Sequence, residues 1–597
     1  MTLKELQTAV KKSKLNAYIV TRSNMFIGQD LLDDENPLRA LTGFSGSAGT
    51  LVVTPDKTFL LVDGRYEIQA ARQTNPDEVK IICGRNNLLA QCLTGLFGGK
   101  PAKVGFNSFT NAVRGIERLA ERFPDIAFIP DTSQIFANNI FGRPCRVFEH
   151  KIEFCGVGRN EKIGGISSRI SSCGCDAYLF TAADSVSWLL NIRSDALPDT
   201  PLVRAYALLD KDGRITLFGD NLNFDFEPAD FGVEPLAKLP RALKAYKNKT
   251  VGFDAETTPY FFRQLFAERK IAECPLEDFC QTAKAEKNPV EISGIEAAHL
   301  RDGVAMVRFL HWLSGNWPGK TELDVVKKLH DFRAQGENYW SESFGTIAAA
   351  GPDGAVVHYQ PAAETDRKLE EGSLLLLDSG AQYFDGTTDI TRTIALGTPS
   401  PEMCDNFTLV LKAHIALASQ KFIDGTDGMS LDKIARSPMW NEGKDYKHGT
   451  GHGVEAIPSG GDHYQGRGHH GHRAKCVIHH LEERGLHIHV VFALRGKDEN
   501  RDDICGKTQN AREQQQADIV DFRFGTAEQT HAGLHQRIDA NDEQHHGTCG
   551  SGEHLKPGPA PSTSVVGLAA HQYGGDCGCR QHGHVGEHMT GIHQQGQ

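Results

Sequence analysis

Residues 374–394 constrain the fold more than any other stretch, because they place two carboxylates within apolar strands. The four-leucine run 374–377 predicts a strand buried on both faces, and it ends at Asp378. A second, β-branched strand at 388–394 contains Asp389, and a glycine-containing turn joins the two into a hairpin. Buried carboxylates are costly unless something positive compensates them, so the hairpin indicates a metal site. Two strand-end aspartates that cap turns are the simpler alternative.

Three histidines fit the same interpretation. His358 ends the apolar segment 343–358, and a lone histidine in such a place is usually an ordinary side chain. His448 and His452 lie in Y-K-H-G-T-G-H-G-V, where the glycines leave the backbone open to a ligand. Two carboxylates and an imidazole together suit Mn²⁺, Co²⁺, Fe²⁺ or Zn²⁺ better than Ca²⁺.

Length and charge exclude several classes of protein. A chain of 597 residues is too long for one core and predicts about three or four domains. The net charge is -12, with scattered Lys and Arg, which argues against nucleic acid and against anionic membranes as partners. No 18-residue apolar run and no signal peptide are evident, so we expect a cytoplasmic protein. The 14 cysteines then fit reduced thiols better than disulfides.

The first half of the chain contains a repeated pattern. A-Y-I-V-T at 17–21 is echoed by A-Y-L-F-T at 177–181, and a strand hairpin follows each. We interpret this as two similar α/β domains, at 1–150 and 155–285. Two unrelated α/β units with common strand chemistry are the alternative.

A third unit, 286–454, begins at the helix start Asn288-Pro289. Its first helix is predicted to be amphipathic, with Leu300, Val304, Val307, Phe309 and Leu310 facing inward. Further helices start at Thr321 and Ser400, so helices flank the strands that carry the aspartates. The predicted fold class is therefore a multidomain combination of α/β and α+β.

Three motifs of this third unit resemble those of one enzyme family. L-D-S-G-A-Q-Y-F-D-G-T-T-D-I-T-R-T, G-P-D-G-A-V-V-H-Y and H-G-T-G-H-G-V resemble the site motifs of aminopeptidase P, the Xaa-Pro aminopeptidase branch of the pita-bread metallopeptidases. L-T-G-F-S-G-S-A-G and V-D-G-R-Y resemble that family's first domain. The resemblance implies two creatinase-like N-terminal domains followed by a pita-bread catalytic domain.

The resemblance also implies roles for individual residues. Asp378 corresponds to a ligand of one metal, Asp389 to a bridging ligand and His452 to an imidazole ligand, whereas His358 and His448 correspond to catalytic groups that bind substrate. Two divalent ions, with Mn²⁺ first, would be the cofactors, and peptides with proline in second position would be the substrates. A homodimer is compatible with the resemblance.

The resemblance ends near Val454, and the composition changes there. Of the 26 histidines, 18 fall in residues 455–597, whereas only 3 of the 31 phenylalanines do. The two further glutamate ligands that the family pattern requires do not appear, and we interpret Glu483 and Glu499 as coincidence. The tail is then either a His/Gln/Gly-rich disordered segment or the product of a wrong reading frame, and we favour the second. The catalytic domain is accordingly expected to be incomplete at its C-terminal end.

Two functions from different classes follow. The first is a metallo-aminopeptidase that releases the N-terminal residue from Xaa-Pro peptides and is slow or inactive as written. The second is a catalytically dead pita-bread protein that serves as a binding module. Creatinase-like hydrolysis without metal is disfavoured by the two aspartates.

Overall fold

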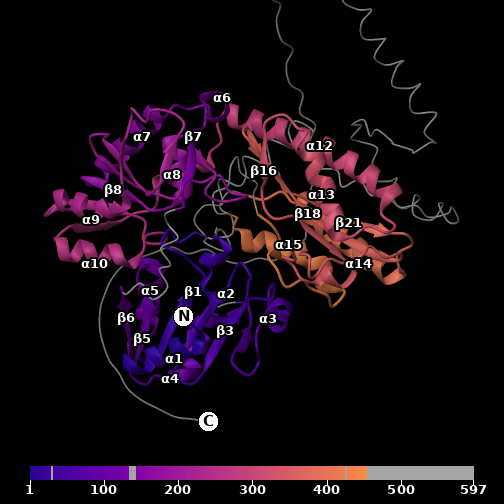
Figure 1. Cartoon of the computed structure of the whole chain (residues 1–597), viewed down its shortest axis with the longest axis horizontal. Coiled ribbons are helices and arrows are strands. Elements are labelled where there is room, and N and C mark those ends of the chain that lie inside the picture. Colours follow the sequence, from indigo (N-terminus) through magenta and orange to yellow (C-terminus); the bar gives the residue numbers. More distant parts are fainter. Residues whose placement is uncertain (29–30, 86, 133–142, 424–425, 453–597) are drawn as a thin grey trace, which may run out of the picture. The chain divides into compact units, whose positions relative to one another are not determined.

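The computed structural model describes residues 1–452, apart from 29–30, 86, 133–142 and 424–425, and every structural statement below concerns these residues (Figure 1). The predicted tail at 455–597, with Glu483 and Glu499, lies outside the described residues. No described helix is both long enough and apolar enough to cross a membrane.

The N-terminal domain is built on one six-stranded sheet with the order β4-β3-β2-β1-β5-β6. Strands β2 and β3 form the hairpin expected after the first strand and pair antiparallel. Helix α1 buries Leu3, Leu6 and Val10 on one face, and Thr2 caps it. The elements are α1 (Leu3–Lys12), β1 (Ala17–Thr21), α2 (Pro37–Thr42), β2 (Thr50–Val53), β3 (Thr58–Val62), α3 (Glu67–Gln73), β4 (Lys80–Cys83), α4 (Leu88–Phe97), β5 (Ala102–Asn107), α5 (Val113–Arg122) and β6 (Ile126–Asp131).

The second domain repeats this architecture on a separate sheet. Its order is β13-β11-β10-β8-β14-β15, and each neighbouring pair has the same parallel or antiparallel sense as its counterpart in the first sheet. The elements are β7 (Cys145–Glu149), α6 (Ile152–Cys155), α7 (Arg159–Ser172), β8 (Ala177–Phe180), α8 (Ala183–Leu190), β9 (Ile192–Ser194), β10 (Tyr206–Asp210), β11 (Ile215–Phe218), β12 (Leu222–Phe224), β13 (Gly232–Glu234), α9 (Leu239–Ala242), β14 (Thr250–Phe253), α10 (Tyr260–Arg269), β15 (Ala272–Pro275) and α11 (Phe279–Ala285). The prediction of two similar α/β domains is therefore confirmed.

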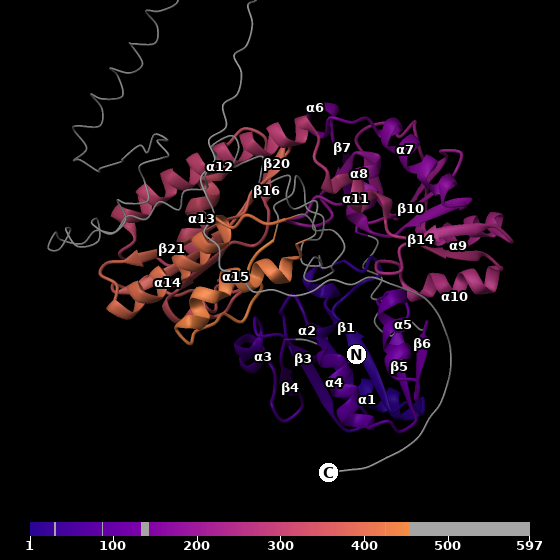
Figure 2. The ribbon, with the colours of Figure 1, turned by 180° about the vertical axis from the view of Figure 1, so that it is seen from behind.

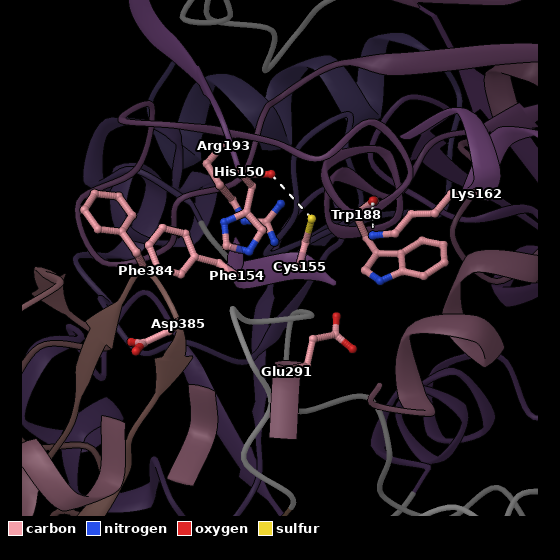
Figure 3. A pocket seen from close by; sticks show the side chains of 9 residues that line it. All are labelled: His150, Phe154, Cys155, Lys162, Trp188, Arg193, Glu291, Phe384 and Asp385. Atoms are coloured by element: carbon pink, nitrogen blue, oxygen red, sulfur yellow. Dashed lines mark hydrogen bonds between the residues drawn. The ribbon is translucent and has the colours of Figure 1, made fainter. Parts of the chain in front are cut away.

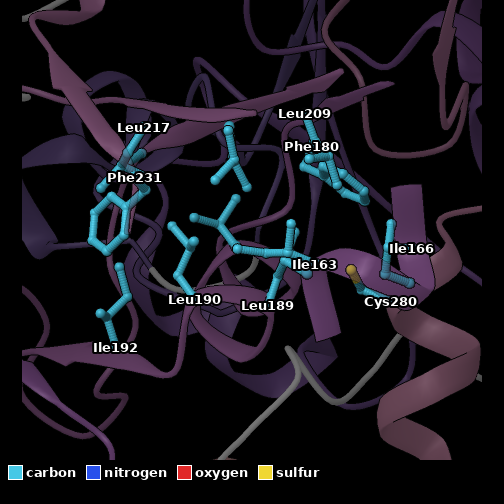
Figure 4. Close-up of a cluster of buried hydrophobic side chains, with 14 of the residues drawn as sticks. Ile163, Ile166, Phe180, Leu189, Leu190, Ile192, Leu209, Leu217, Phe231 and Cys280 are labelled. Atoms are coloured by element: carbon cyan, nitrogen blue, oxygen red, sulfur yellow. The ribbon is translucent and has the colours of Figure 1, made fainter. Parts of the chain in front are cut away.

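A dense apolar cluster holds α7 and α8 to this second sheet (Figure 4). Ile163 and Ile166 of α7 and Leu189 and Leu190 of α8 are buried against strand residues such as Leu209. Burial of such side chains contributes roughly 1.5–3 kcal/mol each. The described cysteines are free thiols, as expected for a reduced protein, and Cys280 is buried in this cluster.

The third domain carries two three-stranded sheets, β16-β19-β20 and β17-β18-β21, together with four helices (Figures 1 and 2). Helix α12 is capped by Asn288, α13 by Thr321 and α14 by Ser400, as predicted. The elements are α12 (Pro289–Asn316), α13 (Glu322–Arg333), β16 (Tyr339–Glu342), β17 (Ile347–Ala350), β18 (Ser373–Ser379), β19 (Ala381–Tyr383), β20 (Gly386–Thr387), β21 (Ile390–Leu396), α14 (Pro401–Ala418) and α15 (Gly428–Asn441).

The predicted inward face of α12 is wrong at three positions, whereas Phe309 is fully buried as predicted and Leu310 packs against the same core. Leu300 is 71% exposed and Val307 66% exposed, and Val304 is exposed as well. The buried face instead comprises Ile295, Ala298, Asp302, Ala305, Met306, Phe309 and Leu313. Hydrophobic periodicity misplaced this face because the core position 302 is occupied by an aspartate, whose charge is compensated by a residue distant in sequence.

The central hairpin is confirmed, with one correction. Strand β18 pairs with β21 in antiparallel register, and Asp378 lies opposite Thr391. The leucine run is not buried on both faces, because Leu375 and Leu377 are buried whereas Leu374 and Leu376 are only half-buried. The run reflects a central position in the sheet, since β18 pairs with β17 on one edge and with β21 on the other.

Candidate functional site

Asp378 lies near the end of β18 and is held by a neighbour across the hairpin. The Thr391 hydroxyl donates a hydrogen bond of 2.7 Å to its Oδ1. Burial raises the pKa of Asp378, while this hydrogen bond and the positive charges of His358 and His452 act in the opposite direction. Both predicted histidines therefore lie close enough to influence this carboxylate.

Asp389 lies between β20 and β21, facing the same region. Burial raises its pKa to about 6, and the negative charge of Asp378 adds to the rise. The Nε2 of His452 lies 3.5 Å from its Oδ2. Two half-buried carboxylates that repel each other, with an imidazole beside them, form an arrangement that a cation would stabilise.

His358 contacts the N-terminal domain, and its charge acts on Asp378. It lies in a turn after the 3₁₀ helix Gly351–Ala355 rather than at a strand end, which corrects the predicted location. Its Nδ1 is 2.6 Å from the Tyr66 Oη and 3.4 Å from the Ser47 Oγ. Ser47 and Tyr66 also hydrogen-bond to each other. Both belong to the two family-like motifs of the first domain, for which sequence analysis assigned no site role.

His448 has different surroundings. Its ring stacks on Tyr446 with 4.8 Å between centroids, and its Nδ1 lies 2.7 Å from the Gly449 carbonyl oxygen. Within the described residues its contacts are thus with its own segment, whereas His452 reaches Asp389. Arg436 of α15 holds this segment by donating to the His448 carbonyl oxygen at 2.6 Å.

A buried ion pair supports the hairpin between the two aspartates. The guanidinium of Arg333 donates to both oxygens of Asp302, at 2.7 and 3.1 Å, and both side chains are fully buried. Arg333 also donates to the Ser379 hydroxyl at 3.1 Å, and the Thr388 hydroxyl donates to Asp302 at 2.8 Å. Ser379 follows Asp378 and Thr388 precedes Asp389 in the sequence, so the pair fixes the backbone beside each carboxylate. Sequence analysis missed this network, because nothing local in the sequence links α12 to α13.

The donor atoms suit a divalent metal, but the set is incomplete. Carboxylate and imidazole ligands are what Mn²⁺ and Zn²⁺ take in proteins. Among the described residues, however, no group of three His, Cys, Asp or Glu side chains is close enough together to hold a metal ion. The described part of the chain therefore brings together a partial ligand set.

Three matches to known families cover most of the chain. Two regions, residues 3–137 and 143–291, each match a Creatinase/Prolidase N-terminal domain. Residues 293–472 match metallopeptidase family M24, so this match extends past Val454.

Similar proteins come from plants, amoebae and animals. Aminopeptidase P2 of Arabidopsis thaliana is 30% identical over 498 residues, which cover 74% of this chain and 69% of the relative. Xaa-Pro aminopeptidase 1 of Dictyostelium discoideum is 30% identical, with 76% of each chain covered. The crystal structure of X-prolyl aminopeptidase from Caenorhabditis elegans, described as a cytosolic enzyme with a di-nuclear active site, matches with a TM-score of 0.68 and 30% identity. That match covers 74% of this chain and 76% of the other.

Proposed function

Because this chain belongs to the aminopeptidase P family of M24 metallopeptidases, we propose that its site is built to hydrolyse the first peptide bond of Xaa-Pro peptides. We further propose that the chain as written does so far more slowly than a relative with a complete ligand set. The observation that supports both proposals is that Asp389 lies beside Asp378 and His452, although no group of three ligand side chains within the described residues is close enough together to hold a metal ion.

The proposed ligands are Asp378, Asp389 and His452, and the proposed cofactors are two divalent ions, with Mn²⁺ first. When bound, such ions acidify a water molecule and polarise the scissile carbonyl group. The described ligand set is partial, so the proposed roles below are those of the side chains themselves.

Three histidines are proposed to act together with the two aspartates. His358 is proposed to bind the substrate, with its Nδ1 fixed by the Tyr66 hydroxyl. The Nε2 of His452 lies 3.5 Å from the Oδ2 of Asp389, close enough for an ion pair when the imidazole is protonated. His448 keeps its proposed substrate-binding role, although its described contacts are with Tyr446 and Gly449.

The second candidate function is a binding module without catalysis. The incomplete ligand set among the described residues favours it, since a weakly held metal cannot support turnover. The two candidates share the peptide-binding surface and differ in hydrolysis, so an activity assay separates them.

The test is an assay of the unchanged chain, residues 1–597, with added Mn²⁺. Release of the first residue is measured from an Xaa-Pro-Xaa peptide, with an Xaa-Ala-Xaa peptide to test specificity. Asp389→Ala provides the blank. We expect slow release that depends on Mn²⁺, prefers proline and is lost in Asp389→Ala. Fast turnover in the parent chain would contradict the proposed slow rate, whereas no release above the blank would favour the binding module.

The cellular location and the oligomeric state are also proposals. We propose a cytoplasmic protein, supported by the C. elegans enzyme, which is described as cytosolic. A homodimer is the proposed assembly, and light scattering on the purified chain measures its mass directly.

A further inference from the structure

A cavity outside the candidate site gathers buried cations. It encloses about 280 Å³ of empty space, part of it open to solvent, with room at its centre for about one water-sized atom (Figure 3). The second domain provides most of the wall, and Glu291 of α12 and the turn between β19 and β20 provide the rest. The lining residues are His150, Phe154, Cys155, Lys162, Trp188, Arg193, Glu291, Phe384 and Asp385. We call this the cationic cavity.

Two buried cations in this wall are bonded only to neutral groups in the described structure. The Lys162 ammonium donates to the Trp188 carbonyl oxygen at 3.0 Å and to the Asn191 side-chain oxygen at 2.7 Å. It also lies 4.1 Å from the centre of the Trp188 ring. Arg193 donates to the backbone carbonyl oxygens of Ser187 and Ile192. Burial lowers the pKa of Lys162 to about 8 and that of Arg193 to about 10.

Negative charge around the cavity is insufficient to balance these cations. The negative charge of Glu291 raises the pKa of both Lys162 and Arg193. Glu291 is also the carboxylate of the cavity that is not already bound to an arginine. Asp385 is paired with Arg301 and also accepts from Asn338. Two buried cations thus face one carboxylate, which leaves an excess of one positive charge. Uncompensated buried charge is costly, so an additional negative group would stabilise this region.

Two buried nitrogen atoms of the wall have no hydrogen-bond partner among the described residues: Nδ1 of His150 and Nε of Arg193. The two side chains are 7% and 6% exposed, respectively. Figure 3 shows the imidazole beside the guanidinium, and the charge of Arg193 helps to lower the pKa of His150, after burial. His150 is consequently neutral, and the tautomer with a proton on Nδ1 can donate.

The end of α6 packs tightly against the start of α12 at the border of the cavity. The side-chain nitrogen of Asn288 donates to the Cys155 carbonyl oxygen at 2.8 Å. At Gly156, φ is +68°, and an added Cβ would lie 2.4 Å from the Asn288 Oδ1. This close approach requires glycine and fixes the end of α6 against the start of α12, so the cavity has a rigid border.

From this geometry we propose that the cationic cavity binds one small monovalent anion, chloride in solution, between the Arg193 Nε and the His150 Nδ1. The anion accepts both orphaned hydrogen bonds and balances the excess charge of Lys162 and Arg193. Larger anions such as phosphate exceed the space at the centre of the cavity. The bound anion would tie the hairpin turn, residues 384–385, to the second domain.

The experiment measures thermal unfolding of residues 1–597 at constant ionic strength, while chloride replaces gluconate. We expect the unfolding midpoint to rise by about 2 °C and to saturate, because an ion that binds the native state stabilises it by mass action. Bromide should act like chloride. Arg193→Met should remove the chloride dependence, and Lys151→Met, an exposed neighbour of His150, should keep it. No peptidase substrate is used, so the result is independent of the proposed function.

A second variant and a hydrogen-exchange measurement test chloride binding independently of Arg193→Met. His150→Phe removes Nδ1 at similar volume and should weaken the chloride effect if Arg193→Met does not fold. Hydrogen exchange of the parent chain, read at residues 149–156 and 383–386, should slow in chloride and not in gluconate. If neither the midpoint nor the exchange responds, or if all variants respond alike, the cavity holds water only and the proposal is wrong.

Discussion

The Oη of Tyr66 lies 2.6 Å from the Nδ1 of His358, so a fully buried tyrosine of the N-terminal domain orients a histidine of the candidate site. The two rings meet edge to face, with 5.5 Å between centroids. The Phe44 ring also packs against the tyrosine ring edge to face, with 5.9 Å between centroids, which helps to fix its position. The N-terminal domain therefore contributes directly to the geometry of the candidate site.

Tyr66→Phe should impair hydrolysis through His358. The substitution keeps the packing and removes one hydrogen bond, so we expect the free energy of unfolding to fall by about 1 kcal/mol. Residual Mn²⁺-dependent hydrolysis should fall about tenfold, with a changed pH profile, because His358 loses its orienting partner. Tyr18→Phe is the matched control, since its hydroxyl donates to Asp131 within the same domain. Equal effects of the two variants on hydrolysis would contradict the assigned role.

Metal-free protein should lose stability as the pH rises from about 4 to 6. Burial and Asp378 raise the pKa of Asp389 to about 6, so the native state binds more protons than the unfolded state within this window. The free energy of unfolding should fall by roughly 1–3 kcal/mol across it and stay at the lower value above it. Denaturant unfolding in the presence of a chelator measures this fall.

Asp389→Asn should flatten that pH dependence and be more stable than the parent at neutral pH. The amide carries no charge, so it avoids both the burial cost and the repulsion from Asp378. The exposed Asp77→Asn serves as control and should keep the parental slope. The same slope in Asp389→Asn and in the parent would show that other groups cause it.

Arg333→Met should be among the most destabilising single substitutions in the third domain. It leaves Asp302 fully buried without its cation, for which we expect a loss of about 3–5 kcal/mol. Lys327→Met, which breaks an exposed pair with Asp331 on the same helix, should cost less than about 1 kcal/mol. The double variant Asp302→Asn, Arg333→Met should recover part of the loss. No recovery would contradict the assignment of the loss to the unpaired charge of Asp302, and would point to the packing of Arg333 or to Glu342, which also pairs with it.

Glu483→Gln and Glu499→Gln should leave Mn²⁺ binding and hydrolysis unchanged. Both residues lack the surrounding strand pattern of a ligand, so we do not count them among the metal ligands. Asp378→Asn is the positive control and should weaken Mn²⁺ binding measured by calorimetry. A loss of Mn²⁺ affinity in either glutamine variant would show that the tail completes the site.

Local chemistry in the sequence determined much of this fold. Helix starts at Asn288, Thr321 and Ser400 follow from side chains that cap their own backbone, which requires no distant partner. The hairpin that carries Asp378 and Asp389 follows from an apolar run, a β-branched run and the turn between them. The two similar N-terminal domains follow from a repeated pattern that produces the same sheet twice.

The tertiary structure alone decided which distant residues meet. The face of α12 depends on Asp302 being neutralised by Arg333, and hydrophobic periodicity cannot detect a buried ion pair. The Tyr66–His358 contact joins residues 292 positions apart, and the cationic cavity joins the second domain to a hairpin turn. Such contacts depend on how domains pack, and packing depends on the whole surface of each domain rather than on any short stretch of sequence.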